Sequence, residues 1–288
     1  MLISVIIATY NSEKTLRQTL DSIRYQTYRD FEVIVIDGKS TDNTLGIVKE
    51  YSDIVKKYIS EKDTGIYNAF NKGICLASGD YICFIGSDDC YCDYSVFDKV
   101  SKNIFDGVNI LSAPILGVNE YTLKQHLLKN RLSNEEVFCG KMIPHPGLFV
   151  RRTIMARYMF NESNKIISDY EFLVRYLLDG GDIQFVDFPV VYFSEVGISS
   201  GEIGSKYWQK RLLEHMVLIE KLKLYDYLDS CINGLTEINR RNTLSYNFKM
   251  LNRSIRKKIG LNINFKKFSF NSKKHKCDLY LCRWCGRC

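Results

Sequence analysis

The chain has 288 residues, of which 45% are hydrophobic and 25% charged, the composition of an ordinary globular protein. This length allows one large domain with a full core, or one domain and an appendage. No stretch approaches the roughly 20 apolar residues of a membrane-spanning helix, and the first residues lack the basic and small-residue features of a signal peptide. We therefore expect a cytoplasmic protein.

The net charge of +7 is concentrated near the C-terminus. Residues 240–288 contain 14 lysines and arginines against one acidic residue, Asp278, whereas the rest of the chain has an excess of acidic residues. Such a basic segment favours an anionic partner, which is a membrane surface or a nucleic acid. The alternative is a solvated tail without a partner.

The first 85 residues alternate between strand and helix patterns. Apolar, β-branched runs predict strands at residues 2–9, 31–36, 55–60 and 81–85. Apolar residues at helical spacing predict helices between them, which begin at Asn11 or Ser12, at Thr41 or Asp42, and at Gly65. This alternation indicates an α/β fold with a mostly parallel sheet and helices on both faces.

Polar side chains gather where three of these strands end. They are Thr9, Tyr10 and Asn11 after the first strand, Asp37 after the second, and Ser87, Asp88 and Asp89 after the fourth. Ligands of such sheets bind beyond the carboxyl ends of the strands. The pattern therefore predicts one site at this edge of the sheet.

The second part of the chain predicts fewer elements. A strand at residues 147–150 precedes a helix that begins at Ser168 and ends at Gly180 and Gly181. A strand or a pair of strands is expected within residues 183–193, and a long helix within residues 207–228.

Six motifs in this order resemble those of the family 2 glycosyltransferases, which have the GT-A fold. The motifs are residues 4–11 (SVIIATYN), 37–44 (DGKSTDNT), 65–73 (GIYNAFNKG), 78–81 (SGDY), 87–89 (SDD) and 168–171 (SDYE). The nearest resemblance is to bacterial exopolysaccharide, colanic-acid and O-antigen transferases. It implies a glycosyltransferase domain over residues 1–200, followed by a helical extension over residues 201–240 and a basic, cysteine-containing tail over residues 241–288.

The resemblance implies an inverting enzyme that takes a sugar from a nucleotide-sugar donor, a UDP-sugar in most relatives. The residues implied to bind the donor are Thr9, Tyr10, Asn11, Asp37, Asn71, Ser87 and Asp88. Taken alone, Asp37 is also typical of a turn before Gly38, and Asn71 of an exposed helix position. Asp42 is expected to cap its helix.

A divalent cation, Mg²⁺ or Mn²⁺, is implied to neutralise the diphosphate as it leaves. Asp88 is expected to be the main ligand, with Asp89 as a second ligand or an orienting group. The family often has an aspartate where this chain has Gly86, which puts chelation by two carboxylates in doubt. The alternatives are a solvated turn or a helix cap, and Asp93 is a more distant candidate.

Asp169 occupies the position of the general base of the family, with Ser168 in place of the usual glutamate and Arg175 downstream. A base is needed because a sugar hydroxyl is a weak nucleophile until its proton is removed. Glu171 is the competing base, and a first-turn acid that favours the helix dipole is the structural alternative.

Two further regions are implied to approach the substrates. His145 is implied to contact a sugar, although a lone histidine is more often structural. Glu195, Gly197 and Ser199 lie where the family closes a loop over the diphosphate, and no histidine stands near them as a further metal ligand.

The C-terminal cysteines and the tail leave other readings open. The spacing of Cys277, Cys282, Cys285 and Cys288 allows a zinc site, but incidental thiols are the simpler interpretation. A second class of function is a non-catalytic protein that binds a membrane or a nucleic acid through its tail, and a third is an enzyme like a sugar-nucleotide pyrophosphorylase. We prefer an enzyme that the tail holds at the inner face of the membrane, where lipid-linked acceptors reside, with no nucleic-acid partner.

Overall fold

The computed structural model describes residues 1–118, 124–195 and 206–227. The chain divides into two compact units, Met1–Leu218 and Ile219–Cys288. The first unit continues beyond residue 200. Gly197, Ser199, the tail and its four cysteines lie outside the described residues. No helix in the described part is both long and apolar enough to cross a membrane.

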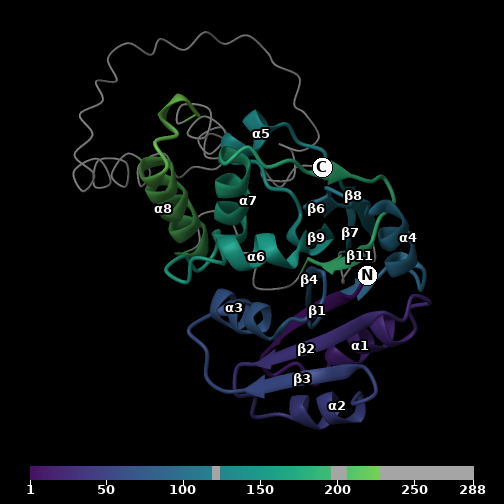
Figure 1. The fold of residues 1–288 in the computed structure, drawn as a ribbon. Coiled ribbons are helices and arrows are strands. Elements are labelled where there is room, and N and C mark those ends of the chain that lie inside the picture. The colour runs from purple at the N-terminus through teal and green to yellow at the C-terminus, as the bar shows by residue number, and fades with distance from the viewer. Residues whose placement is uncertain (119–123, 196–205, 228–288) are drawn as a thin grey trace. The chain divides into compact units, whose positions relative to one another are not determined.

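A seven-stranded sheet forms the centre of the first unit (Figure 1). Its strands, in spatial order, are β10 (Gln184–Phe185), β6 (Ile110–Ser112), β9 (Leu148–Arg151), β4 (Tyr81–Gly86), β1 (Ile3–Thr9), β2 (Phe31–Asp37) and β3 (Val55–Ser60). Strands β1 to β4 are parallel, whereas β9 runs antiparallel to both β4 and β6. The α/β fold with a mostly parallel sheet is therefore confirmed.

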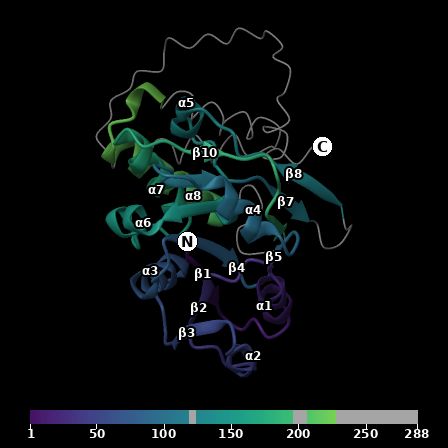
Figure 2. The ribbon, with the colours of Figure 1, turned by 45° about the vertical axis from the view of Figure 1, so that its right-hand side comes forward.

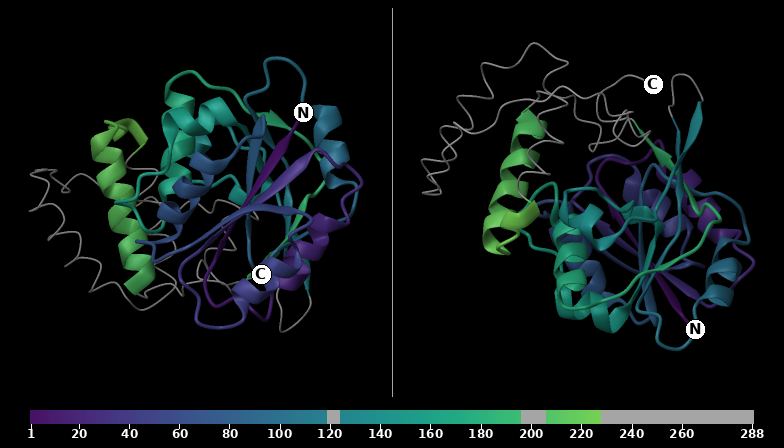
Figure 3. Two further views of the ribbon diagram at one scale, coloured as in Figure 1. Left: turned by 60° about the horizontal axis from the view of Figure 1, so that its bottom comes forward. Right: turned by 90° about the horizontal axis from the view of Figure 1, so that it is seen from above.

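Helices cover both faces of this sheet. Alternate residues of a strand point to opposite faces, so each face of β1 packs against different helices. The odd-numbered residues of β1 join a core cluster with residues of α1 (Leu16–Arg24), α2 (Thr44–Glu50) and α4 (Val96–Asn103). The even-numbered Ile6 faces α3 (Ile66–Leu76), where a Cβ on Gly73 would lie 2.5 Å from Ile6 Cγ2. Glycine thus lets α3 lie close against the sheet. Figure 3 shows the ribbon, with the sheet and its helices, from two further directions.

A second sheet of four strands was not expected from the sequence. Its order is β5 (Cys90–Tyr91), β11 (Val191–Ser194), β7 (Ile115–Val118) and β8 (Gln125–Leu128). Figure 2 shows these short strands together with the helical elements of the second half. Those elements are α5 (Asn134–Phe138), η1 (His145–Gly147), α6 (Arg152–Tyr158), α7 (Ser168–Leu178) and α8 (Lys206–Lys221).

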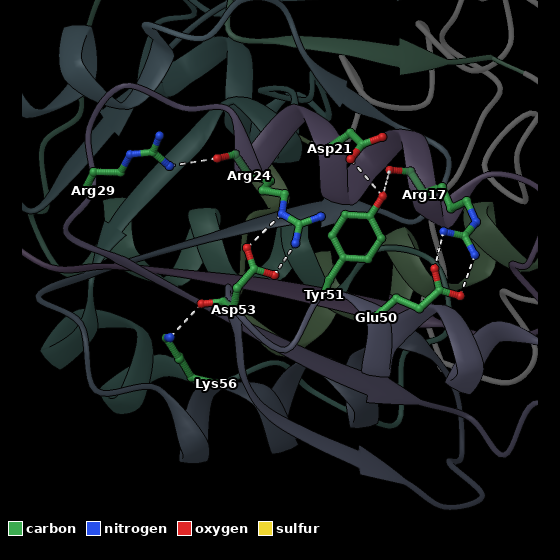
Figure 4. Close-up of polar contacts among 8 residues, drawn as sticks. All are labelled: Arg17, Asp21, Arg24, Arg29, Glu50, Tyr51, Asp53 and Lys56. Atoms are coloured by element: carbon green, nitrogen blue, oxygen red, sulfur yellow. Dashed lines mark hydrogen bonds and ion pairs between the residues drawn. The ribbon is translucent and has the colours of Figure 1, made fainter.

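Ion pairs at the surface join α1 to the segment that contains α2 (Figure 4). The two terminal nitrogens of Arg17, Nη1 and Nη2, donate to Glu50, both at 2.6 Å. Arg24 makes a forked contact with Asp53 through Nε and Nη2, at 2.8 and 2.7 Å. The Arg24 guanidinium also lies 4.8 Å from the centre of the Tyr51 ring. Between 35% and 50% of each of these four side chains is exposed, so the two ion pairs lie at the surface and outside the core.

Candidate active site

The ends of β1 and β2 are joined through the carboxylate of Asp37, which is fully buried. Its Oδ1 accepts from the hydroxyl of Thr9 at 3.1 Å, and its Oδ2 accepts from the hydroxyl of Ser60 at 2.6 Å. Both the backbone N–H and the hydroxyl of Ser40 also donate to it. The carboxylate therefore holds the loop after β2, a structural contribution that does not test its predicted contact with a nucleotide.

The loop after β1 is pinned against the loop after β2. Asn11 has a left-handed φ of 50°, a conformation that asparagine tolerates better than most residues. Its backbone N–H donates to Ser40 Oγ at 2.8 Å, and its side-chain oxygen accepts from the Thr41 N–H at 2.9 Å. The side chain of Asn11 thus bridges two loops and does not cap α1, whose N-cap residue is Thr15.

An aromatic ring and a carboxylate flank the backbone of Gly38. Tyr10 is 65% exposed. A Cβ on Gly38 would lie 3.4 Å from Tyr10 Cδ2 and 2.8 Å from Asp63 Oδ2. Only glycine fits this position without movement of a neighbour. Sequence reasoning did not select Asp63. Its place just before the motif at residues 65–73 was the signal that could have drawn attention to it.

The turn after β4 presents the next polar group. The hydroxyl of Ser87 lies 2.8 Å from that of Ser12, so this turn contacts the loop after β1. Asp88 is exposed, whereas Asp89 is buried with an exposed fraction of 3%. The two neighbouring carboxylates therefore have different surroundings.

Asp89 ties the turn to the second sheet. Its Oδ1 accepts from the Ser194 N–H of β11 at 2.9 Å, and its Oδ2 accepts from the Gly86 N–H at 3.2 Å. Burial, with a smaller contribution from the charge of Asp88, raises the pKa of Asp89 to about 7. These two contacts orient the turn, which is one of the two roles expected for Asp89, and its role as a second metal ligand stays a prediction.

The turn geometry also explains why Gly86 departs from the usual motif. A Cβ at this position would lie 2.7 Å from Asp89 Oδ2 and 2.8 Å from Asp88 Oδ1. An aspartate could not replace Gly86 without displacing one of these carboxylates. Glycine therefore lets both carboxylate oxygens approach the end of β4.

A small donor set is available for a divalent cation. No group of three or more histidine, cysteine, aspartate or glutamate side chains with metal-binding geometry occurs in the described part of the chain. The exposed Asp88 fits Mg²⁺ or Mn²⁺, which often bind through one or two carboxylates and take their other ligands from phosphates and water. Asp93 lies just before α4 instead, where it accepts from the N–H of the N-cap residue Ser95 at 2.7 Å and pairs with Lys99.

Asp169 lies in the first turn of α7 and is held through one oxygen. Its Oδ1 accepts from the Tyr67 hydroxyl of α3 at 2.8 Å and from the Tyr170 N–H at 3.0 Å. No residue that the structure describes donates a hydrogen bond to its Oδ2. One oxygen is thus anchored while the other is available to a ligand.

Asn71 has a structural position that differs from the prediction. Its amide is buried, and it donates to the Phe160 carbonyl and to Glu162 Oε1, both at 2.9 Å. Its oxygen accepts from the Phe160 N–H at 2.9 Å. These contacts occupy the amide, so Asn71 fixes the segment before α7 rather than facing a nucleotide.

Glu171, the competing base, is also engaged elsewhere. Only 1% of it is exposed, and its Oε2 accepts from the amides of Asn161 and Asn164 at 2.8 and 2.5 Å. Its Oε1 lies 3.9 Å from Arg175 Nε. Arg175 donates to the carbonyls that precede this loop, including that of Met159. Both residues therefore order the loop before α7.

His145 connects the end of β4 with Asp169. Its ring stacks on Phe84 of β4 at 5.0 Å and lies 5.6 Å from the rings of Phe70 and Phe160. Burial lowers the pKa of His145, and the charge of Asp169 opposes this shift. The imidazole is therefore neutral near pH 7. His145 therefore packs on the strand that precedes the Asp88 turn and is close enough to Asp169 to respond to its charge.

The loop before Asp169 is also held from α8. Glu214 is buried, and its two carboxylate oxygens accept from three consecutive backbone N–H groups, those of Lys165, Ile166 and Ile167, at 2.9 to 3.2 Å. The next residue, His215, packs its ring 4.9 Å from that of Tyr170. Sequence reasoning missed both residues because nothing local marks them.

The second sheet brings a histidine to Glu195. His126 Nε2 on β8 lies 3.4 Å from Glu195 Oε1, just after β11. The sequence search found no histidine close to Glu195 because the pair is 69 positions apart in the chain. The sheet register, in which β7 lies between β8 and β11, brings them together.

Residues 4–162 match the model of the glycosyl transferase family 2, so the chain belongs to this family of glycosyltransferases. The chain is 28% identical over 216 residues to a PGL/p-HBAD biosynthesis glycosyltransferase of Mycobacterium tuberculosis, covering 73% of this chain and 84% of the other. It is 26% identical over 161 residues to the Escherichia coli enzyme UDP-Glc:alpha-D-GlcNAc-diphosphoundecaprenol beta-1,3-glucosyltransferase WfgD, covering 56% and 62%.

Solved structures share the GT-A fold with this chain. Residues 1–349 of Staphylococcus aureus TarS in complex with UDP-GlcNAc superpose with a TM-score of 0.67 at 22% identity, covering 85% of this chain and 76% of the other. Glucosyl-3-phosphoglycerate synthase from Mycobacterium tuberculosis, solved with Mn²⁺ and UDP, gives a TM-score of 0.54 at 18% identity, covering 74% and 79%. These likenesses confirm the predicted fold.

Proposed function

We propose that this glycosyltransferase moves a sugar from a UDP-sugar to a hydroxyl of a glycan or lipid-linked acceptor in bacterial surface polysaccharide synthesis, with inversion at the anomeric carbon. The observation that supports this most is the position of His145, which packs on β4, the strand that Asp88 follows, and lies within electrostatic reach of Asp169. Asp88 follows β4, whose Phe84 stacks on His145, and Asp169 acts electrostatically on the same imidazole.

The donor nucleotide is assigned to the joined loops after β1 and β2. The exposed ring of Tyr10 offers a flat apolar surface to a base, since aromatic rings stack favourably. Thr9, Asn11 and Asp37 shape this loop pair through the hydrogen bonds described above, and Asp63 adds a carboxylate beside Gly38. Ser87, which directly precedes Asp88 in the turn after β4, contacts this region through the hydroxyl of Ser12.

Asp88 would hold the divalent cation, Mg²⁺ or Mn²⁺, and Asp89 would orient the turn from below. When bound, the cation supplies positive charge to the two phosphates of the leaving nucleotide. One exposed carboxylate is enough for such a site, because Mg²⁺ commonly takes its other ligands from phosphate oxygens and water. The Mn²⁺ in the related synthase supports the same assignment.

Asp169 would serve as the general base through its Oδ2. As the acceptor oxygen bonds to the anomeric carbon, the hydroxyl proton passes to Asp169, and the bond from that carbon to the diphosphate oxygen breaks. The electron pair of that bond leaves with the nucleoside diphosphate. Attack opposite the leaving group inverts the anomeric configuration, because no covalent enzyme intermediate is formed.

The test is a turnover assay on the full chain with UDP-glucose and UDP-N-acetylglucosamine, with Mn²⁺ or with EDTA. We expect release of UDP that requires the metal, and NMR of the transferred sugar should show the inverted anomer. A thermal-shift panel of UDP-, GDP- and dTDP-sugars selects the donor. Binding of none of them, together with no release of nucleotide, would contradict the proposal.

The lipid-linked acceptor is supported by the E. coli relative, whose name specifies a diphosphoundecaprenol acceptor, and by the basic residues at positions 240–288. We expect the full chain to float with anionic liposomes and to lose this binding at high salt. The matched control replaces lysines and arginines of residues 240–288 by glutamine. Equal flotation of both proteins would contradict a membrane role of this segment.

A further inference from the structure

Tyr67 contacts the proposed base from outside the helix that carries it. It lies on α3, 102 positions from Asp169, and only 6% of it is exposed. Its hydroxyl lies 2.8 Å from Asp169 Oδ1 and 2.8 Å from the Ile166 carbonyl oxygen. A phenol has one proton, so it donates to one of these acceptors at a time.

The surroundings of Tyr67 keep it a donor. Burial raises the pKa of Tyr67 far above its ordinary value, and the charge of Asp169 adds to this shift. The phenol is therefore neutral at every pH at which the protein works, and it cannot itself take a proton from an acceptor. Its ring is fixed by Phe160, with ring centres 5.4 Å apart, so the hydroxyl has little freedom to turn away.

The contacts on Asp169 divide its two oxygens. The Tyr67 hydroxyl and the Tyr170 N–H both donate to Oδ1. Oδ2 accepts no hydrogen bond from the part of the chain that the structure describes. A carboxylate anchored through one oxygen presents the other in a fixed direction, and fixed geometry of the base is worth much of its catalytic effect.

We infer that Tyr67 is a positioning residue, which anchors Oδ1 of Asp169 and so directs Oδ2 at the acceptor hydroxyl. This inference rests on the proposed function. It assigns a role to Tyr67, a residue of the motif at residues 65–73 to which the sequence analysis attached no function. Without the hydroxyl, the carboxylate can rotate and loses a hydrogen bond that favours its ionised form.

The test is Tyr67→Phe, which removes one oxygen and keeps the ring. Tyr158→Phe is the matched control, because Tyr158 is also buried and donates to an aspartate, Asp179 Oδ2 at 2.7 Å, at the far end of α7. The readout is UDP release by the full chain from UDP-glucose or UDP-N-acetylglucosamine with Mn²⁺, measured across pH.

We expect Tyr67→Phe to lower kcat about tenfold or more with an unchanged KM for the donor. Its acidic limb of activity should lie at higher pH than that of the wild type. Tyr158→Phe should keep the wild-type kcat and profile, even where both variants lose similar thermal stability. A Tyr67→Phe enzyme with the wild-type kcat and pH profile would overturn the inference.

Asp169→Asn separates this inference from the proposed function. If Asp169→Asn keeps full activity, the base assignment itself is wrong. If Asp169→Asn is inactive while Tyr67→Phe equals Tyr158→Phe, only the positioning role fails. Combining Tyr67→Phe with Asp169→Asn should add no further loss to the residual rate, because residues that act as a unit are not additive.

Discussion

The two halves of the first unit hold their polar residues in different ways. Between residues 1 and 86, the site residues at the ends of β1 and β2 bond to the loops of adjacent parallel strands, as Thr9 does with Asp37. Between residues 87 and 195, polar side chains make contacts across long separations, as Asp89 does with Ser194. The ends of β1 and β2 are therefore held mainly by each other, whereas the second half depends on contacts between distant segments.

The largest expected effect falls on the second half. Asp169→Asn keeps the shape of the side chain but cannot accept the proton, so kcat should fall on the order of a thousandfold. Donor binding, measured by calorimetry with UDP, should remain. Glu171→Gln is no suitable control because Glu171 is buried in the loop network. Wild-type turnover by Asp169→Asn would remove this residue from the mechanism.

The comparison also shows what the sequence could predict. Strands at residues 2–9 and 31–36 appear as β1 and β2 with nearly the same bounds, because buried parallel strands leave nearly continuous apolar runs. The second sheet was missed because strands such as β5, with two residues, are too short to show a period.

Among the site residues, the sequence indicated groups that stand at the ends of predicted elements. It placed Asp37, Asp88 and Asp169 at such ends, as found. It missed Tyr67 and Glu214, since their contacts with the α7 loop span 102 and 47 to 49 positions. A polar residue inside a helix pattern carries no local sign of a distant partner.

A second prediction tests the boundary between the halves, at the turn after β4. Asp88→Asn should raise the Mn²⁺ concentration needed for half-maximal UDP release by about 10- to 100-fold, the effect typical of a damaged metal site. Asp93→Asn is the control, because Asp93 accepts from the Ser95 N–H just before α4 and pairs with Lys99. An equal metal requirement in both variants would argue against Asp88 as the ligand.

A third prediction concerns the dependence of the second half on α8. Glu214→Gln replaces one accepting oxygen by an amide NH₂, so one or two of the three backbone N–H groups of residues 165–167 lose their partner. The free energy of unfolding, measured in urea, should fall by about 1–3 kcal/mol. Glu135→Gln on α5, an exposed position, is the control and should change little. Equal stability of both variants would show that α8 is dispensable for this loop.

A fourth prediction uses His215 on the same helix. Burial, with a smaller effect from Arg211, lowers the pKa of His215 from 6.5 to about 4. Protons therefore bind the unfolded chain more readily, so the stability that His215 contributes is present above pH 6.5 and is lost as the pH falls towards 4. His215→Phe keeps a ring against Tyr170, and it should remove about 2 kcal/mol of the stability lost between pH 7 and pH 5. Parallel pH curves for both proteins would contradict this.

The smallest effect is expected on the surface of the first half. Glu50→Gln breaks the forked contact with Arg17 (Figure 4), in which both N–O distances are 2.6 Å. About half of each side chain is exposed, so water replaces the lost hydrogen bonds and salt screens the charges. The melting temperature should therefore stay close to that of the wild type, and the response to added salt should be the same. A loss comparable to that of Glu214→Gln would mean that this half also depends on contacts outside its sheet edge.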